Sequence, residues 1–209
     1  MTKGSAMTSA KVIYQYLESL PQGAAFPASA LREYGSTDNI RQILSRLVKL
    51  GKLERVARGV FAKPKYNSQK EAVLPSAVEV AEILTQSLGE TVTVHGAEAA
   101  RQLHLSTQAP MKPVFYTSGN TRKLKVLNRT IELRHVNPSR LIAPGKTSGL
   151  IISALSYLGK DNVSVETLKM VRIRVKKSDF IETLALIKKM PAWLSDVFYQ
   201  YQKRYPNDK

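Results

Sequence analysis

The feature that most restricts the fold of this chain is an amphipathic segment over residues 37–50. Its aliphatic side chains recur at the i, i+3, i+4, i+7 spacing that places them on one face of an α-helix. Thr37 or Asp38 is expected to cap this helix, and Gly51 is expected to end it. Such a helix must bury its aliphatic face against neighbouring elements. The residues of that face are Ile40, Ile43, Leu44, Leu47 and Leu50.

The segments on either side of this helix complete a supersecondary pattern. Residues 12–20 predict a first helix, and residues 27–35 predict a second, short one. Residues 52–62 predict two strands around Arg58-Gly59, where the glycine supplies the positive φ of a tight turn. The predicted order is a helix, a short helix, a helix with a polar face and a basic hairpin. This is the order of elements in a winged helix-turn-helix.

The face of the 37–50 helix that lies opposite the aliphatic residues carries amides, hydroxyls and cations. The major groove of B-DNA admits one α-helix, and side chains of these types read base edges there. Gln42 suits adenine, Arg46 suits guanine, and Arg58 at the hairpin tip suits a narrow minor groove. The lysines and Arg55 are expected to contact phosphates. The predicted DNA contacts are Thr37, Asn39, Arg41, Gln42, Ser45, Arg46, Lys49, Lys52, Arg55, Arg58 and Lys63.

Two other interpretations of this module stay open. A polar helix face is often simply solvated, and winged helices also serve as protein–protein modules. The charge favours DNA, because residues 1–70 contain twelve basic and four acidic residues, a net charge of +8. The whole chain of 209 residues has a net charge of +16, which is also compatible with RNA, an anionic membrane or an acidic protein partner.

A second basic region lies towards the C-terminus. Residues 71–120 have a net charge of −3, whereas residues 121–209, with eighteen basic and seven acidic residues, have a net charge of +11. Two basic runs in this region are compatible with a second nucleic-acid contact, with an acidic partner surface or with a solvated face. The residues of this possible second basic surface are Arg122, Lys123, Lys125, Arg172, Arg174, Lys176 and Lys177.

The polar, proline-containing stretch 63–70 predicts a domain boundary. We expect a DNA-binding domain over residues 7–65 and a second domain over residues 71–209, mixed α/β to about residue 142 and helical after about residue 147. The expected fold class is therefore α+β. The expected elements of the second domain are helix 78–88, strand 91–94, a helix from Gly96, strand 114–117, a hairpin of 123–127 with 130–136, helices 147–158, 164–175 and 179–189, and a last helix from Pro191.

Residues 8–142 resemble the AbiEi-like antitoxins of bacterial abortive-infection and toxin–antitoxin loci. The resemblance lies in four blocks and is weakest after about residue 145. These blocks are residues 51–62 (GKLERVARGVFA), 92–105 (VTVHGAEAARQLHL), 114–123 (VFYTSGNTRK) and 131–136 (IELRHV).

The resemblance implies a two-part antitoxin. Its winged domain would bind double-stranded DNA at the promoter of its own operon and repress it. Its C-terminal domain would counteract a cognate AbiEii-like nucleotidyltransferase toxin, directly or without a stable complex. A ligand-responsive winged-helix regulator with no toxin partner is the alternative, and the neighbouring gene would separate the two.

Nothing in the sequence favours an enzyme. Cysteine is absent, which excludes disulfides, thiolate nucleophiles and cysteine-based zinc sites. His95, His104 and His135 lack the helical spacing of a metal pair, and a turn-stabilising hydrogen bond explains His95 as well as catalysis does. The sequence around Gly145-Lys-Thr147 lacks the earlier glycine of a phosphate-binding loop. We expect no catalytic residue, no metal and no cofactor.

The chain is expected to be cytoplasmic and to have no membrane partner. No stretch approaches the roughly 20 apolar residues that a membrane span requires. The N-terminus lacks the apolar core of a secretory signal, and the absence of cysteine suits a reducing compartment.

An enzyme acting on nucleic acid is the third functional hypothesis. Such an enzyme needs clustered acidic residues to bind metal ions, and the acidic residues of this chain are scattered.

Overall fold

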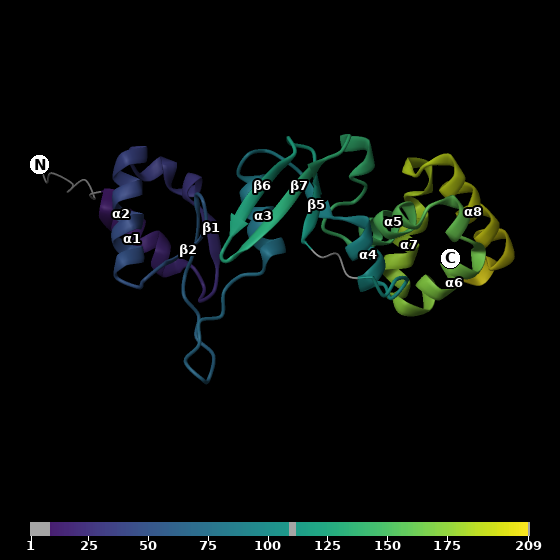
Figure 1. The fold of residues 1–209 in the computed structure, drawn as a ribbon, viewed down its shortest axis with the longest axis horizontal. Coiled ribbons are helices and arrows are strands. Elements are labelled where there is room, and N and C mark those ends of the chain that lie inside the picture. Colours follow the sequence, from purple (N-terminus) through teal and green to yellow (C-terminus); the bar gives the residue numbers. More distant parts are fainter. Residues whose placement is uncertain (1–8, 109–111, 209) are drawn as a thin grey trace, which may run out of the picture. The chain divides into compact units, whose positions relative to one another are not determined.

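The computed structural model describes residues 9–108 and 112–208, and it confirms the α+β class. The strands of this described part form a mixed sheet in the order β1-β3-β2-β6-β7-β5-β4, and the C-terminal residues are helical (Figure 1). The chain divides into two compact units. The N-terminal unit comprises the chain up to Gly89 together with residues 124–130, and the C-terminal unit comprises residues 90–123 and 131–209.

The N-terminal unit contains the predicted helix, short helix, helix and hairpin in the expected order. The short helix is a 3-10 helix, and an additional strand, β1, pairs antiparallel with β3. Helix α3 packs on β1 and β3. The elements are α1 (Ser9–Ser19), β1 (Ala25–Pro27), η1 (Ala28–Tyr34), α2 (Thr37–Lys49), β2 (Glu54–Ala57), β3 (Val60–Ala62) and α3 (Ala77–Gln86).

The aliphatic face of α2 is buried as its spacing predicts. Ile40, Leu44 and Leu47 are at most 4% exposed and pack with side chains of α1, η1 and the hairpin. Two local expectations were wrong. The N-cap is Ser36, whose hydroxyl accepts a hydrogen bond from the backbone of Asn39, and Leu50 is 59% exposed because the helix ends before it.

The hairpin of β2 and β3 turns at Gly59, as predicted. Its φ of +80° lies in the left-handed region that glycine adopts without steric cost. The register between β2 and β3 shifts between Arg55 and Ala57, so the hairpin contains a bulge. The turn is held by the backbone N–H of Ala28, which donates a 2.8 Å hydrogen bond to the carbonyl of Gly59.

The C-terminal unit contains a small sheet and a helical region. Strand β5 pairs antiparallel with β4 and parallel with β7. Its elements are β4 (Val92–Val94), α4 (Gly96–Gln102), β5 (Val114–Thr117), β6 (Arg122–Val126), β7 (Arg129–His135), η2 (Pro138–Arg140), α5 (Thr147–Leu158), η3 (Lys160–Asn162), α6 (Val165–Arg174), α7 (Lys177–Ala185), η4 (Ile187–Lys189), α8 (Ala192–Arg204) and η5 (Pro206–Asp208), with the tip of the β6–β7 hairpin assigned to the N-terminal unit.

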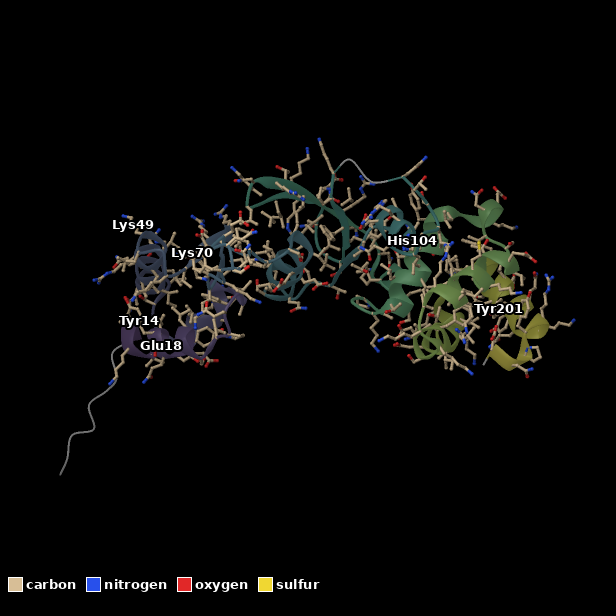
Figure 2. The ribbon with its side chains drawn as sticks, turned by 90° about the horizontal axis from the view of Figure 1, so that it is seen from below. Tyr14, Glu18, Lys49, Lys70, His104 and Tyr201 are labelled. Atoms are coloured by element: carbon tan, nitrogen blue, oxygen red, sulfur yellow. The ribbon has the colours of Figure 1, made fainter. Side chains whose placement is uncertain are left out.

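A single apolar cluster joins the C-terminal helices. Phe180, Leu194, Phe198 and Tyr201 are fully buried in it together with aliphatic side chains of α5 and α6. Figure 2 shows Tyr201 among these helices. At Gly96, where α4 meets α5, a Cβ would lie 2.7 Å from the carbonyl oxygen of Ser153, so the two helices approach more closely than any larger residue permits.

The boundary between the units differs from the one expected at residues 63–70. Helix α3 follows that stretch but packs on the N-terminal strands. The tip of the β6–β7 hairpin also belongs with these strands, since Val126 pairs with Ala57 and the N–H of Leu127 donates to the carbonyl of Val56. Within the described residues, no helix is long and apolar enough to span a membrane.

Candidate nucleic-acid interface

The polar face of α2 is exposed along its length. Residues of the buried face alternate with exposed side chains at helical spacing, so the two faces predicted from the sequence are both present. Figure 2 shows Lys49 at the surface of the N-terminal unit. The exposed side chains on this face are Arg41, Gln42, Ser45, Arg46 and Lys49.

A groove of about 780 Å³ lies between α2, η1 and the hairpin. It is formed within the N-terminal unit alone, so α2 and the Gly59 turn share one concave surface. Aliphatic and aromatic side chains of the core, among them Leu44 and Phe61, form its apolar part. No acidic residue of the described chain lines it. Its cations are Arg32, Arg41, Lys49, Arg55 and Arg58.

The exposed face of α2 lines two hollows. Arg41, Ser45 and Lys49 line both the groove beside the hairpin and a shallower hollow of about 430 Å³. Gln42 and Arg46 line only the shallower hollow. The row formed by Arg41, Ser45 and Lys49 therefore lies nearest the hairpin, and the two predicted base-reading residues lie on its far side.

The remaining predicted contacts on α2 differ in their surroundings. Thr37 lines the groove. Asn39 is half-buried and lines neither hollow. Asp38 pairs with Arg41 at 3.1 Å, but both side chains are at least 75% exposed, so this pair leaves the Arg41 guanidinium accessible.

Lys63, a predicted phosphate contact, is hydrogen-bonded within the N-terminal unit. Its Nζ donates hydrogen bonds to the carbonyl oxygens of Leu17, Glu18 and Leu20 at 3.1, 3.2 and 2.8 Å. These carbonyls end helix α1, where a cation also interacts favourably with the helix dipole. We therefore leave Lys63 out of the candidate interface. Lys52 is exposed but lines a different hollow, beside Lys63 and α1.

The family of the chain follows from a comparison with protein-family models. Residues 12–183 match the model described as a family of unknown function, DUF6088. The chain belongs to the DUF6088 family. No curated protein matches it significantly.

Solved structures that resemble this DUF6088 protein include one of low sequence identity. It is the crystal structure of the Rv2827c protein from Mycobacterium tuberculosis, which is 13% identical. The alignment covers 96% of the present chain and 76% of that chain, with a TM-score of 0.46.

In the DUF6088 chain, the three arginines of the possible second basic surface all have intramolecular partners. Arg122 forms a bidentate pair with Glu90, with nitrogen–oxygen distances of 2.6 and 3.1 Å. Arg174 donates to the carbonyl oxygens of Leu103 and His104 at 3.0 and 2.8 Å. Arg172 is 20% exposed, and its guanidinium lies 6.0 Å from the ring centre of Phe180. These contacts hold loops and helices of the C-terminal unit.

The four lysines of the same set are exposed. Lys123 and Lys125 lie on β6, while Lys176 and Lys177 lie at the start of α7. None of the four has an ion-pair partner within the part of the chain that the structure describes. The set is thus divided into arginines with intramolecular partners and exposed lysines without an ion-pair partner among the described residues.

His95 caps helix α4. Its Nδ1 accepts a 3.1 Å hydrogen bond from the backbone N–H of Ala97, which is the turn-stabilising role considered for it. The ring packs 4.6 Å from the ring centre of Tyr116 and 5.7 Å from that of Tyr157. Burial lowers the pKa of the His95 imidazole, and the nearby Arg134 lowers it further. The neutral ring that accepts this hydrogen bond is therefore favoured.

One cation of the groove was not predicted. Arg32 lies on η1, outside both segments whose basic residues were selected from the sequence. The only local signal for it is its position after the buried Leu31, which places it on the exposed side of the short helix.

Among the described residues, no cluster of three or more histidine or acidic side chains is placed to hold a metal ion.

Proposed function

We propose that this protein binds double-stranded DNA through α2 and the β2–β3 hairpin. The observation that supports the proposal best is the groove in which the exposed face of α2 and the Gly59 turn meet. It contains five cations and no acidic residue among the described side chains, so it attracts a phosphate backbone. An α-helix with polar side chains fits the major groove of B-DNA.

The roles of the side chains follow from their positions. Helix α2 enters the major groove, where Gln42 and Arg46 face base edges on one side of the helix. Arg41 and Lys49 lie nearer the hairpin and neutralise phosphates. Arg58, at the exposed tip of the hairpin, reaches an adjacent minor groove.

The test is fluorescence anisotropy with labelled DNA from upstream of the operon. The double variant Arg55→Ala/Arg58→Ala removes two groove cations from the hairpin without touching the core, so it is expected to weaken binding at least tenfold. Lys188→Ala/Lys203→Ala removes two exposed lysines from the C-terminal unit and is the matched control for loss of charge. Equal weakening by both double variants would mean that net charge, and not the groove, determines binding.

We further propose that the protein is an antitoxin that represses its own promoter and counteracts a nucleotidyltransferase toxin without catalysing a reaction. This proposal depends on the sequence resemblance to AbiEi-like antitoxins. Its test uses the full chain with Arg41→Ala/Lys49→Ala, which should release promoter repression and still rescue growth when the toxin is expressed from another plasmid. Loss of rescue by this variant, with its fold intact, would contradict two separable functions.

The alternative function is that of a ligand-responsive winged-helix regulator without a toxin partner. A pocket of about 380 Å³ in the C-terminal unit favours it, because that volume suits a small molecule. A toxin gene beside this one would favour the antitoxin, and its absence would favour the regulator.

A further inference from the structure

The pocket in the C-terminal unit has a composition that the proposed DNA contact does not explain. It lies between β4, β5, the segment after β7, α5 and the start of α8, and its lining comes entirely from the C-terminal unit. Its apolar wall includes the buried Val136, Ile152 and Met190. The other lining residues include cations, aromatic rings and hydroxyl groups, and none of the described lining residues is acidic.

Two cationic side chains line this pocket. Arg140 and Lys189 both line it, and neither has a carboxylate partner within the described part of the chain. Pro191 and Trp193, at the N-terminus of α8, line the pocket beside them. That helix has thirteen residues and no side-chain cap, so the N–H groups of its first turn add to the positive potential.

Three aromatic side chains line the same pocket. They are Tyr116, Tyr157 and Trp193. The ring of His95 packs on both tyrosines and so fixes their positions. Ser156 and Thr93 present hydroxyl groups beside the rings. Aromatic faces bind planar heterocycles by stacking, and hydroxyl groups donate to or accept from the edges of such rings.

We infer that this pocket binds a nucleotide. Arg140, Lys189 and the start of α8 take its phosphate, and Trp193 with the two tyrosines takes its base. A pocket of about 380 Å³ lies within the range of small-ligand sites and accommodates one nucleotide. The same chemistry is offered by a free nucleotide and by the phosphorylated terminal nucleotide of a nucleic acid. The inference is independent of DNA binding by α2, because the two sites share no residue.

The experiment uses the intrinsic fluorescence of the full-length protein. Trp193 is the single tryptophan of the sequence, so its emission reports on this pocket alone. Each of the four ribonucleoside monophosphates is titrated into the protein, with excitation near the red edge of tryptophan absorption. N-acetyltryptophanamide is the control for the inner-filter effect of the nucleotide, and calorimetry verifies the affinity. We expect saturable quenching by at least one of the four. The matching nucleoside and inorganic phosphate should each bind at least about tenfold more weakly, since each lacks half of the contacts.

Variants locate the binding. Lys189→Ala should weaken the nucleotide about tenfold, whereas Lys188→Ala, which removes the adjacent exposed lysine outside the lining, should leave its affinity unchanged. Arg41→Ala/Lys49→Ala should also leave it unchanged, which separates this site from the DNA interface. A 5′-phosphorylated oligonucleotide that quenches as strongly as the nucleotide would support the inference with a nucleic-acid end as the source. Absence of saturable binding by all four nucleotides, or equal effects of Lys188→Ala and Lys189→Ala, would overturn it.

Discussion

The backbone N–H of Ala28 donates a 2.8 Å hydrogen bond to the carbonyl oxygen of Gly59. The first of these residues begins η1 and the second is the turn of the β2–β3 hairpin. This bond, together with the pairing of β1 and β3, fixes the hairpin beside the short helix. The groove proposed to receive DNA therefore has a preformed wall, and its shape depends on the backbone geometry of one glycine.

Substitution of that glycine should reduce both stability and DNA affinity. In Gly59→Ala the new Cβ meets no neighbouring atom, so its effect is the strain of a φ of +80°, about 1–2 kcal/mol in the free energy of unfolding. Gly145→Ala, at a φ of +74° in the C-terminal unit and also free of close neighbours, is the matched control for strain. Urea denaturation should show a similar loss for both, and anisotropy should show weakened DNA binding for Gly59→Ala only.

The two sides of the exposed face of α2 should differ in their effect on specificity. Gln42→Ala and Arg46→Ala should each cost about 1–3 kcal/mol in binding to the operator and little in binding to random DNA. Lys49→Ala should weaken both and flatten the dependence of affinity on salt. Anisotropy titrations with both DNAs at several salt concentrations distinguish these outcomes. Wild-type behaviour of all three variants would mean that α2 is not the recognition helix.

Lys63 should contribute to stability and not to DNA binding. Lys63→Met keeps the aliphatic stem and removes the ammonium that donates to three carbonyl groups at the end of α1, so about 1–2 kcal/mol of unfolding free energy should be lost. Lys52→Met, in an exposed lysine without such contacts, should leave stability unchanged. A stable Lys63→Met protein with weakened DNA binding would return Lys63 to the phosphate contacts first predicted for it.

The C-terminal unit should lose stability on acidification because of His95. Its pKa in the folded protein lies below its ordinary value, so the unfolded chain takes up a proton first as the pH falls. The stabilising contribution of the neutral ring is complete above a pH of about 6.5 and is lost as the pH falls from there through the folded pKa. In His95→Asn, which keeps an N-cap acceptor that does not titrate, this part of the pH dependence should be absent from thermal denaturation curves.

Local patterns were sufficient to predict the winged module and some elements of the C-terminal unit. The exposed face of α2, the turn at Gly59 and the strand at residues 114–117 each depend on residues that are close together in the sequence. Helix α5 likewise spans residues 147–158, the range expected from the sequence. Hydrophobic spacing and turn chemistry act over a few residues, which is why these elements were predicted correctly.

Contacts between distant parts of the chain could not be predicted in this way. Lys63 binds carbonyls more than 40 positions away, and Arg174 binds carbonyls about 70 positions away, so neither partner was visible beside the basic residue. The pocket in the C-terminal unit combines Thr93, Arg140 and Trp193, which share no local pattern. A basic run in a sequence does not reveal which of its members are already hydrogen-bonded.

The intramolecular partners of Lys63, Arg122 and Arg174 have a consequence for how the formal charge of +16 acts. A guanidinium or ammonium group that is hydrogen-bonded inside the protein and held against it has fewer N–H groups left to bind phosphate oxygens. We therefore expect the salt dependence of the proposed DNA binding to depend more on the exposed cations that line the α2 groove than on the total charge of the chain.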